Sequence, residues 1–315
     1  MSLISAALGL AILLIAGDLL VRGAVNLSLR LGVPALIVSL TVVAFGTSAP
    51  ELLIAVQAIR DEAPDLALGN VVGSNTANIL LVLGLPALVA GLGTSGHDTR
   101  KSYVTMVIVS AIFVAVAFLG PISWVHGLIF LGLLAVILGD QMREAVLHRR
   151  AQAATPDEVA AADPKLAGWK IWVFLALGLA GLPLGADILV GAARQIARTY
   201  GVSDSVIGLT LVAIGTSLPE LATTIVAAMR RQADVALGNA IGSNVFNLLA
   251  ILGIASFFGP IPVPPDFLRF DLWVMLASAA VIAPVVFSNR HDMNRRWGIA
   301  LTALYAAYLI VVVKG

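Results

Sequence analysis

Two stretches of the chain, VAFGTSAPELLIA (residues 43–55) and VAIGTSLPELATT (residues 212–224), place the same unusual residues in apolar surroundings. Each contains a glycine, two adjacent hydroxyl residues, a proline and a glutamate. The two glutamates, Glu51 and Glu220, are 169 positions apart. A carboxylate behind a helix-breaking proline is costly inside an apolar segment, and this sequence contains the combination twice.

The composition around these stretches is that of a membrane protein. Of 315 residues, 59% are hydrophobic and only 12% are charged, whereas soluble domains carry about 25% charged residues. A helix needs about 20 mostly apolar residues to span a bilayer, and apolar runs of this length recur along the whole chain. We therefore predict an all-α membrane protein with ten transmembrane helices. The predicted spans are residues 3–27, 35–59, 66–89, 104–119, 124–147, 169–193, 206–229, 235–258, 272–286 and 297–313.

Charge and cysteine content narrow the class of protein further. The net charge of +1 gives no indication of nucleic-acid binding, and the lack of cysteine excludes disulfides and thiolate metal sites. The N-terminus lacks the basic segment of a signal peptide, so we expect it to form the first mature helix. With both termini outside, most Lys and Arg residues fall in inner loops, and residues 148–168 form a cytoplasmic connector. The sequence thus predicts a multi-pass protein of a bacterial or archaeal plasma membrane, embedded in the lipid bilayer, with no obligatory protein partner.

The 169-residue offset extends well beyond the two glutamates. Residues 41–84 and 210–253 are identical at about half of their positions. If each half has five spans, an odd number, the second half enters the membrane in the opposite direction. We therefore predict two inverted-topology five-helix repeats, at residues 1–147 and 169–315. This architecture is typical of alternating-access transporters, although channels and membrane enzymes can also be duplicated.

The repeated motif predicts a compact set of oxygen atoms. Proline lacks an N–H and kinks a helix, so Pro50 and Pro219 each free a backbone carbonyl beside a glutamate. Carbonyl, hydroxyl and carboxylate oxygens together favour hard cations such as Ca²⁺, Na⁺ or Mg²⁺. Two glutamates supply a charge that one Ca²⁺ neutralises, and Na⁺ or protons could replace it in exchange. The next span of each half adds a polar stripe, formed by Asn70, Ser74 and Asn78 and by Asn239, Ser243 and Asn247.

Some residues of these stripes have a simpler structural interpretation. Buried asparagines often hold membrane helices together, and that role is expected of Asn70, Asn75, Asn239 and Asn244. Glycines spaced by four residues let helices approach closely. For the two glutamates, in contrast, the cost of a buried carboxylate favours a functional role. The glycine pairs are Gly69 with Gly73 and Gly238 with Gly242.

The motifs resemble the two alpha-repeats of the calcium/cation antiporter superfamily, in particular the prokaryotic sodium/calcium exchangers. The residues that carry the resemblance are GTSAPE…GNVVGSNTAN and GTSLPE…GNAIGSNVFN, within residues 41–84 and 210–253. The resemblance implies a secondary active antiporter, not an enzyme, that exchanges Na⁺ for Ca²⁺ by alternating access. Ca²⁺ and Na⁺ would bind as substrates without any cofactor, and the first and sixth helices would slide against the remaining bundle. The implied ion ligands are Ala44, Thr47, Ser48, Glu51, Ser74, Asn78, Ala213, Thr216, Ser217, Glu220, Ser243 and Asn247.

The motif residues also bear on which ion drives the exchange. Some relatives carry Asp at the position of Asn247, which in potassium-dependent members is linked to potassium use, so Asn78 and Asn247 argue against potassium coupling. The proton-coupled branch typically has Gly-Asn-Ala-Thr-Glu where this chain has Gly-Thr-Ser-x-Pro-Glu, which favours sodium. The alternative is a proton-driven calcium exchanger, or an exchanger of another divalent cation. An intramembrane hydrolase with Ser48 or Ser217 as nucleophile lacks a histidine or lysine within either motif to act as base.

Overall fold

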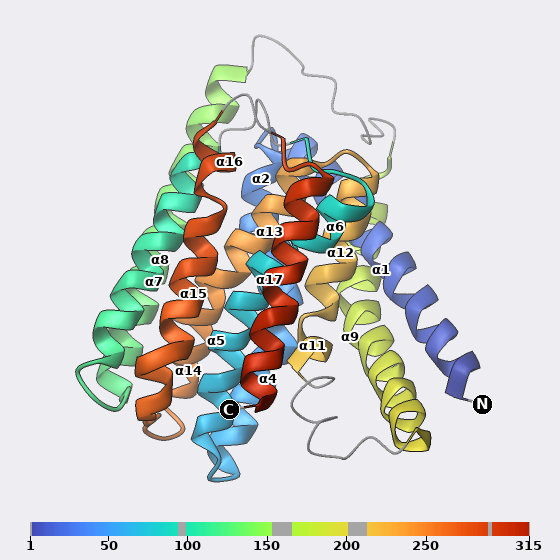
Figure 1. Cartoon of the computed structure of the whole chain (residues 1–315). Helices are drawn as coiled ribbons and strands as arrows, with labels where there is room; N and C mark the ends of the chain where they lie inside the picture. The colour runs from blue at the N-terminus through green and yellow to red at the C-terminus, as the bar shows by residue number, and fades with distance from the viewer. Residues whose placement is uncertain (1, 94–98, 153–165, 201–212, 289–291, 315) are drawn as a thin grey trace.

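The chain folds into a bundle of helices (Figure 1). The computed structural model describes residues 2–93, 99–152, 166–200, 213–288 and 292–314. Most of its helices are α-helices, and three short π-helical turns, η1, η3 and η4, interrupt them. The first half contains α1 (Ser2–Leu31), α2 (Ala35–Val38), η1 (Ser39–Val43), α3 (Ala44–Thr47), α4 (Ala49–Arg60), α5 (Pro64–Leu80), α6 (Gly84–Val89), α7 (Arg100–Ala117) and α8 (Trp124–Gln152). The second half contains α9 (Gly168–Thr199), α11 (Ala213–Thr216), α12 (Leu218–Met229), α13 (Ala233–Phe246), η3 (Asn247–Ile251), α14 (Leu252–Ala255), η4 (Phe267–Asp271), α15 (Leu272–Val281), α16 (Ala283–Phe287) and α17 (Arg295–Lys314).

The lengths of the helices agree with a membrane protein. Within the described residues, eight helices are long and apolar enough to cross a membrane, or nine if the bent pair from α2 to α4 counts as one span. The predicted span at 206–229 is described only from residue 213, as α11 and α12, and its first part lies outside the described residues. The described chain is therefore an all-helical membrane protein with eight or nine spans.

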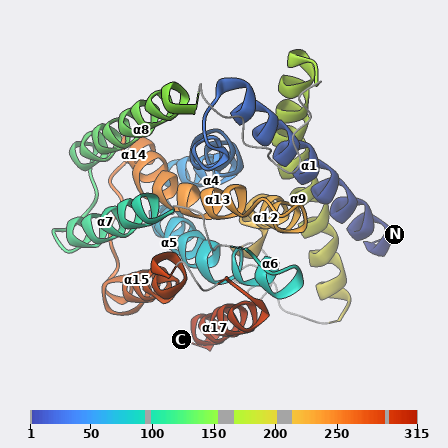
Figure 2. The ribbon, with the colours of Figure 1, turned by 90° about the horizontal axis from the view of Figure 1, so that it is seen from above.

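The helices with the polar motifs occupy the centre of the bundle. Seen from above, α4, α5, α12 and α13 are surrounded by α7, α8, α15 and α17, while α1 and α9 cross along one side (Figure 2). In its most apolar window the span Ala233–Ala255 is 100% buried, whereas Trp124–Leu147 is 17% buried. Outer helices expose apolar side chains, as expected where lipid is the solvent. The two glutamate motifs are thus held away from the lipid-facing surface.

Helices α1 and α9 pack through small residues. A Cβ atom on Gly9 would lie 2.7 Å from the backbone N of Leu189, and one on Gly178 would lie 2.9 Å from the backbone N of Leu20. Such close backbone approach is possible only because these positions lack a side chain. The two contacts are related by the sequence offset, since Gly178 and Leu189 are the counterparts of Gly9 and Leu20. Side chains of α1 and α9 also form most of a hydrophobic cluster distinct from the larger core.

The turns that follow α4 and α12 have the same backbone structure. Glu62 and Arg231, which are sequence counterparts, have positive φ values of 58° and 57°. The hydrogen bonds from Ala63 N to the α4 backbone and from Gln232 N to the α12 backbone are both 2.8 Å long. The α4–α5 turn lies at the lower end of the bundle and the α12–α13 turn at the upper end (Figure 1). Equivalent segments of the two halves therefore lie at opposite ends of the molecule.

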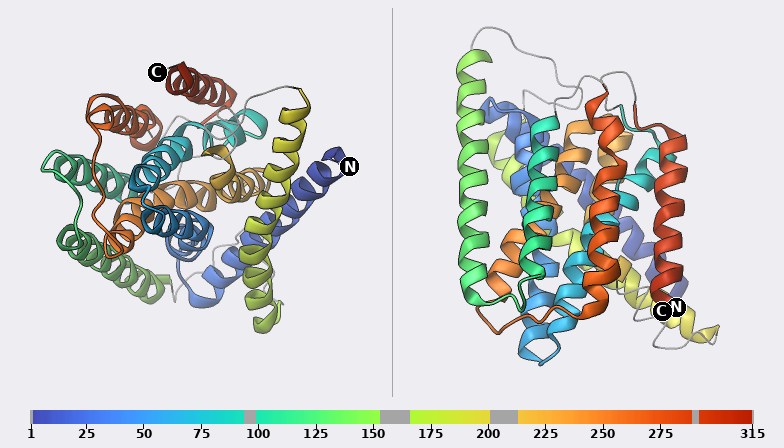
Figure 3. Two further views of the ribbon diagram at one scale, coloured as in Figure 1. Left: turned by 90° about the horizontal axis from the view of Figure 1, so that it is seen from below. Right: turned by 60° about the vertical axis from the view of Figure 1, so that its left-hand side comes forward.

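Short backbone bridges connect loops at both ends of the bundle. At one end Leu92 N donates to Met293 O at 2.9 Å, and at the other Ile122 N donates to Ile261 O at 2.8 Å. The N- and C-terminal ends of the described chain both lie at the lower end, on different sides of the bundle (Figures 1 and 3).

Candidate functional site

Each glutamate of the repeated motif stands just after a break in a helix. The segments before and after Ser48 are bent by 41° relative to each other. Ser48 has φ −83° and ψ 2°, and Ser217 has nearly the same values, φ −85° and ψ 4°. A proline follows each serine within the first turn of the next helix, where its missing N–H is tolerated. Glu51 and Glu220 consequently lie in first turns, where the helix dipole favours a negative charge.

Both carboxylates are buried in the interior of the bundle. Glu51 and Glu220 are each only 1% exposed. Ser48 Oγ, from the motif of Glu51, donates to Oε1 of Glu220 at 3.3 Å, so the two motifs meet. The Oε2 atoms of both glutamates are buried without a hydrogen-bond partner. Two carboxylates buried where their motifs meet require cations or protons to offset their charge.

Other predicted ligands also present buried oxygen atoms that have no hydrogen-bond partner. An unpaired buried polar atom costs about 1–3 kcal/mol, and such atoms are rare enough that each requires an explanation. Hydroxyl and amide oxygens with free lone pairs are ligands for hard cations, so the cluster fits an ion-binding site. The atoms are Oγ of Ser74, Ser217 and Ser243 and Oδ1 of Asn78 and Asn247.

The remaining predicted ligands lie beside the breaks. Thr47 Oγ1 is 3.2 Å from Oδ1 of Asn239 and 3.3 Å from the carbonyl O of Ala44. That carbonyl also accepts the backbone N–H four residues further on, at 3.0 Å, so a cation would compete for it. Thr216 is buried at the end of α11, which begins at Ala213. The structure thus brings the polar ligands of both halves to the centre of the bundle.

Asn239 supports this arrangement, in agreement with the expectation that it holds helices together. Its Nδ2 donates to the carbonyl O of Glu220 at 3.2 Å and to Thr224 Oγ1 at 3.1 Å, while its Oδ1 accepts from Thr47. The amide therefore connects the break of one half to the break of the other. Thr224 carried no signal in the sequence, because its counterpart is Ala55 and the pair is not repeated.

Four asparagines form a second network between α5 and α13. Asn75 Nδ2 donates to the backbone O of Asn244, and Asn244 Nδ2 donates to the backbone O of Asn75, both at 3.3 Å. Asn78 Nδ2 donates to Asn244 Oδ1, and Asn247 Nδ2 donates to Asn75 Oδ1, both at 3.0 Å. All four side chains are at most 3% exposed. The expectation that Asn75 and Asn244 hold helices together agrees with these contacts.

The predicted close approach at the glycine pairs is seen for α13. A Cβ atom on Gly242 would lie 2.7 Å from the carbonyl O of Leu40, and one on Gly238 would lie 2.8 Å from Cβ of Ser39. For α5, a Cβ atom on Gly73 would meet no atom of the described residues within 4 Å. Packing of α13 against the broken helix of the first half brings Ser243 and Asn247 to the site.

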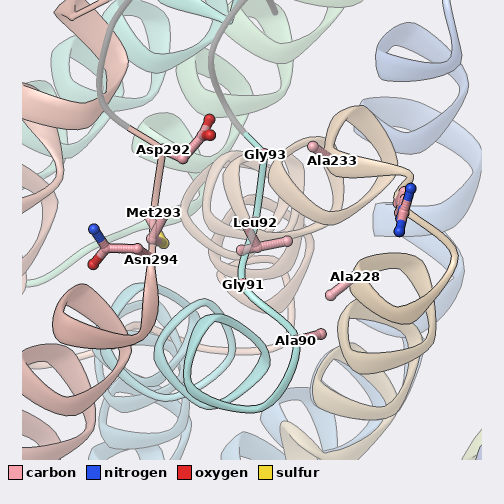
Figure 4. Close-up of a pocket in the computed structure, with 10 residues that line it drawn as sticks. Ala90, Gly91, Leu92, Gly93, Ala228, Ala233, Asp292, Met293 and Asn294 are labelled. Carbon is pink, nitrogen blue, oxygen red and sulfur yellow. The ribbon is translucent and has the colours of Figure 1, made fainter.

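A separate pocket of about 490 Å³ opens at the end of the bundle that contains the α12–α13 turn (Figure 4). It is lined by residues 90–93, 228, 231, 233 and 292–294. Its two charged residues, Arg231 and Asp292, are both exposed. None of the predicted ion ligands lines this pocket, so it is distinct from the candidate site.

Comparison with known proteins agrees with the fold. The family model described as sodium/calcium exchanger protein matches residues 1–142 and 170–314. The inner membrane protein YrbG of Escherichia coli (strain K12) is 32% identical over 307 residues, covering 96% of this chain and 94% of YrbG. The sodium/calcium exchanger MaX1 of Methanosarcina acetivorans is 31% identical over 338 residues, covering 97% of this chain and 96% of MaX1.

A solved structure leads to the same family. The sodium-calcium exchanger NCX_Mj, in a crystal soaked without Na⁺ and Ca²⁺, superposes with a TM-score of 0.83 at 28% identity, covering 99% of this chain and 98% of NCX_Mj. Most of the chain is thus matched by family model, by sequence relatives and by structure. The chain belongs to the sodium/calcium exchanger protein family.

Proposed function

We propose that this protein is an antiporter that exchanges Na⁺ for Ca²⁺ across the plasma membrane by alternating access. The observation that carries the proposal is the buried pair Glu51 and Glu220, surrounded by neutral oxygens without hydrogen-bond partners. Ca²⁺ takes about 6–8 oxygen ligands in flexible geometry, and two carboxylates balance its charge. Two relatives by sequence or structure, MaX1 and NCX_Mj, are named as sodium/calcium exchangers.

The proposed ion ligands are the residues that the sequence motifs indicate. The carboxylates bridge a central Ca²⁺, and the hydroxyl, amide and carbonyl oxygens on either side serve Na⁺. The unpaired serine and asparagine oxygens support this assignment. The full set is Ala44, Thr47, Ser48, Glu51, Ser74, Asn78, Ala213, Thr216, Ser217, Glu220, Ser243 and Asn247.

The proposal includes ten spans in two inverted five-helix repeats, residues 1–147 and 169–315, joined by a connector at residues 148–168. The equivalent turns at Glu62 and Arg231, which lie at opposite ends of the bundle, support it. The contacts of Gly9 with Leu189 and of Gly178 with Leu20 support it as well. Contacts exchanged between counterpart residues are what a two-fold relation between halves produces.

Helices α1 and α9 form the moving part in this mechanism. Their side chains form most of a hydrophobic cluster that is distinct from the larger core. An interface of small residues lets two helices move relative to a bundle without large side chains locking them in place. Motion of this pair would expose the ion site first on one side of the membrane and then on the other.

The orientation has both chain termini outside the cell. The two ends of the described chain lie at one end of the bundle, and the end of α8 and the start of α9 lie at the other (Figure 1). Arg100, Lys101 and Arg230 belong to inner loops in this orientation, as the distribution of positive charge in membrane proteins requires.

Transport by purified protein in liposomes tests the proposal. We expect Ca²⁺ uptake driven by an outward Na⁺ gradient, with little uptake on a proton or potassium gradient when Na⁺ is absent. We expect Glu51→Gln and Glu220→Gln each to reduce this uptake about 100-fold or more, because a single remaining carboxylate leaves Ca²⁺ incompletely neutralised. Isotope uptake in the three gradients measures both effects.

A matched control is Glu144→Gln. Glu144 is a half-exposed carboxylate on α8 that pairs with Lys101 at 2.9 Å, and its substitution should leave uptake within about twofold of the unchanged protein. Equal uptake on a proton gradient without Na⁺ would favour a proton-driven exchanger. Full exchange by both Glu51→Gln and Glu220→Gln would refute the proposed site.

A further inference from the structure

The asparagine network determines which end of each amide faces the ion site. An asparagine amide has a donor end, NH₂, and an acceptor end, the oxygen. Asn78 uses its NH₂ to bond Asn244 Oδ1, and Asn247 uses its NH₂ to bond Asn75 Oδ1. The oxygens of Asn78 and Asn247 consequently point away from these bonds, and both are buried without a hydrogen-bond partner.

Asn75 and Asn244 are themselves held in one orientation. The NH₂ group of each donates to the backbone carbonyl of the other at 3.3 Å. This leaves only the oxygen of each side chain to face the neighbouring amide. If either side chain turned over, its NH₂ would face another NH₂ and both bonds would be lost, which leaves buried polar groups without partners.

We propose that Asn75 and Asn244 are positioning residues that turn the amides of Asn247 and Asn78, respectively, so that both present oxygen to the transported cation. Without this constraint either amide could present NH₂, whose partial positive charge repels a cation. The inference rests on the proposed function, and it adds a cause for the ligand geometry. Hydrogen bonds of this kind behind a metal ligand typically change metal affinity about 10–100-fold.

Each positioning asparagine orients a ligand that belongs to the other half, which makes the inference specific. Asn75, on α5, orients a ligand at the start of η3 in the second half, and Asn244, on α13, orients a ligand on α5 in the first half. Asn75 has no side-chain bond to Asn78, although both lie on the same helix. A residue that only held the helices together would affect both ligands equally.

A double-mutant cycle on Ca²⁺ uptake tests this pattern. Asn75→Ala and Asn247→Ala should each raise the Ca²⁺ concentration for half-maximal uptake about tenfold or more, with a smaller effect on the maximal rate. The double variant Asn75→Ala/Asn247→Ala should have the same half-maximal Ca²⁺ concentration as Asn247→Ala alone, because the amide that Asn75 orients is already absent. In the double variant Asn75→Ala/Asn78→Ala, the effects of the two substitutions on the half-maximal Ca²⁺ concentration should be close to additive. The reciprocal pair, Asn244 with Asn78, should show the same coupling.

Thr76→Val is the matched control. Thr76 is a fully buried neighbour on α5 whose hydroxyl donates to its own helix, at Val72 O. Its counterpart in the second half is already a valine, Val245. Thr76→Val should leave the half-maximal Ca²⁺ concentration within about twofold of the unchanged protein, because hydroxyls bonded within a helix contribute little to neighbouring sites.

The outcomes separate this inference from the proposed function. If the unchanged protein exchanges Na⁺ for Ca²⁺ and Asn75→Ala keeps its Ca²⁺ dependence, the positioning role is wrong while the function stands. Additive effects of Asn75→Ala and Asn247→Ala would also overturn it. If the unchanged protein does not exchange these ions, the function itself fails. For variants with low uptake, Ca²⁺-induced thermal stabilisation of the monodisperse protein gives the same comparison without transport.

Discussion

Counterpart serines make different hydrogen bonds in the two halves of the site. Ser48 Oγ donates to Glu220 at 3.3 Å, whereas Ser217 Oγ is buried without a hydrogen-bond partner. The residues are repeated, but the contacts are not. Alternating access requires this kind of inequality, because one half of a two-fold site must be engaged while the other is not.

Neutral hydroxyls that face the site should contribute to ion affinity. We expect Ser74→Ala and Ser243→Ala each to raise the half-maximal Ca²⁺ or Na⁺ concentration about fivefold, since one oxygen ligand is worth about 1 kcal/mol after desolvation. Initial uptake rates over a range of each ion measure the change. Ser110→Ala is the control, because Ser110 Oγ donates to its own helix at Met106 O, 2.9 Å away. Unchanged dependence on both ions in both variants would remove these serines from the site.

The sequence predicts the acids and serines of the site but not the asparagines that orient it. Glu51 and Glu220 stand out because each follows a proline in an apolar segment and recurs at a fixed offset. Asn75 and Asn244 recur at the same offset, yet their role depends on bonds from a side chain to the backbone of the other half. Neither spacing nor repetition encodes such a bond.

Hydropathy predicts where the helices lie better than it predicts where π-helical turns interrupt them. The predicted span at 124–147 lies within α8, and the span at 169–193 lies within α9. The π-helical turns at Ser39–Val43 and Asn247–Ile251 were not predicted. A π-turn leaves no consistent composition, because it forms where neighbouring helices and bound ligands displace the regular hydrogen bonds.

An ion pair links helix α1 to α12. Arg230, at the end of α12, pairs with Asp18 of α1, which also pairs with Arg22 at 3.0 Å. The counterpart of Arg230 is Asp61 and that of Asp18 is Asp187, so the counterpart positions carry two acids in place of an ion pair. The connection between α1 and the bundle is therefore not repeated between α9 and α4.

Breaking this pair should change the balance between inward- and outward-open states. We expect Asp18→Asn and Arg230→Gln each to change the exchange rate about fivefold, and the double variant to change it no further than Asp18→Asn, because both remove the same α1–α12 pair, worth about 1 kcal/mol. Uptake rates of the four proteins complete the cycle. Asp187→Asn is the control, because it removes the counterpart acid from α9 without affecting the pair of Asp18 with Arg230. Independent, additive effects would show that Asp18 and Arg230 do not act together.

At the scale of the whole molecule, α1 and α9 form a pair that contacts the bundle through its own hydrophobic cluster. The pair is closest where glycines cross, and a Cβ atom on Gly178 would lie 2.7 Å from Cβ and 2.9 Å from Cα of Leu20. Few side chains could be added here without moving a backbone. The same pair also packs against the broken helices, since Leu179 of α9 lies next to Gly46 and Val190 of α9 lies next to Gly215.

A methyl group at this crossing should block exchange. We expect Gly178→Ala to reduce uptake about tenfold, because overpacking against backbone costs about 1–3 kcal/mol and pushes apart the two helices of the pair that is proposed to move. Gly191→Ala is the matched control on the same helix, since a Cβ atom there meets no atom of the described residues within 4 Å. Uptake and elution profile are measured for both. Unchanged exchange by folded Gly178→Ala would mean that the crossing is not tight during transport.

The reciprocal bonds between Asn75 and Asn244 give the two halves one equivalent contact. Each asparagine gives the other the same hydrogen bond at the same length, so this contact is the same when it is viewed from either end of the bundle. A contact of this kind favours neither side for entry of an ion. In the proposed exchange the combined electrochemical gradients of the two ions set the direction of net Ca²⁺ movement, and the direction reverses when their balance reverses.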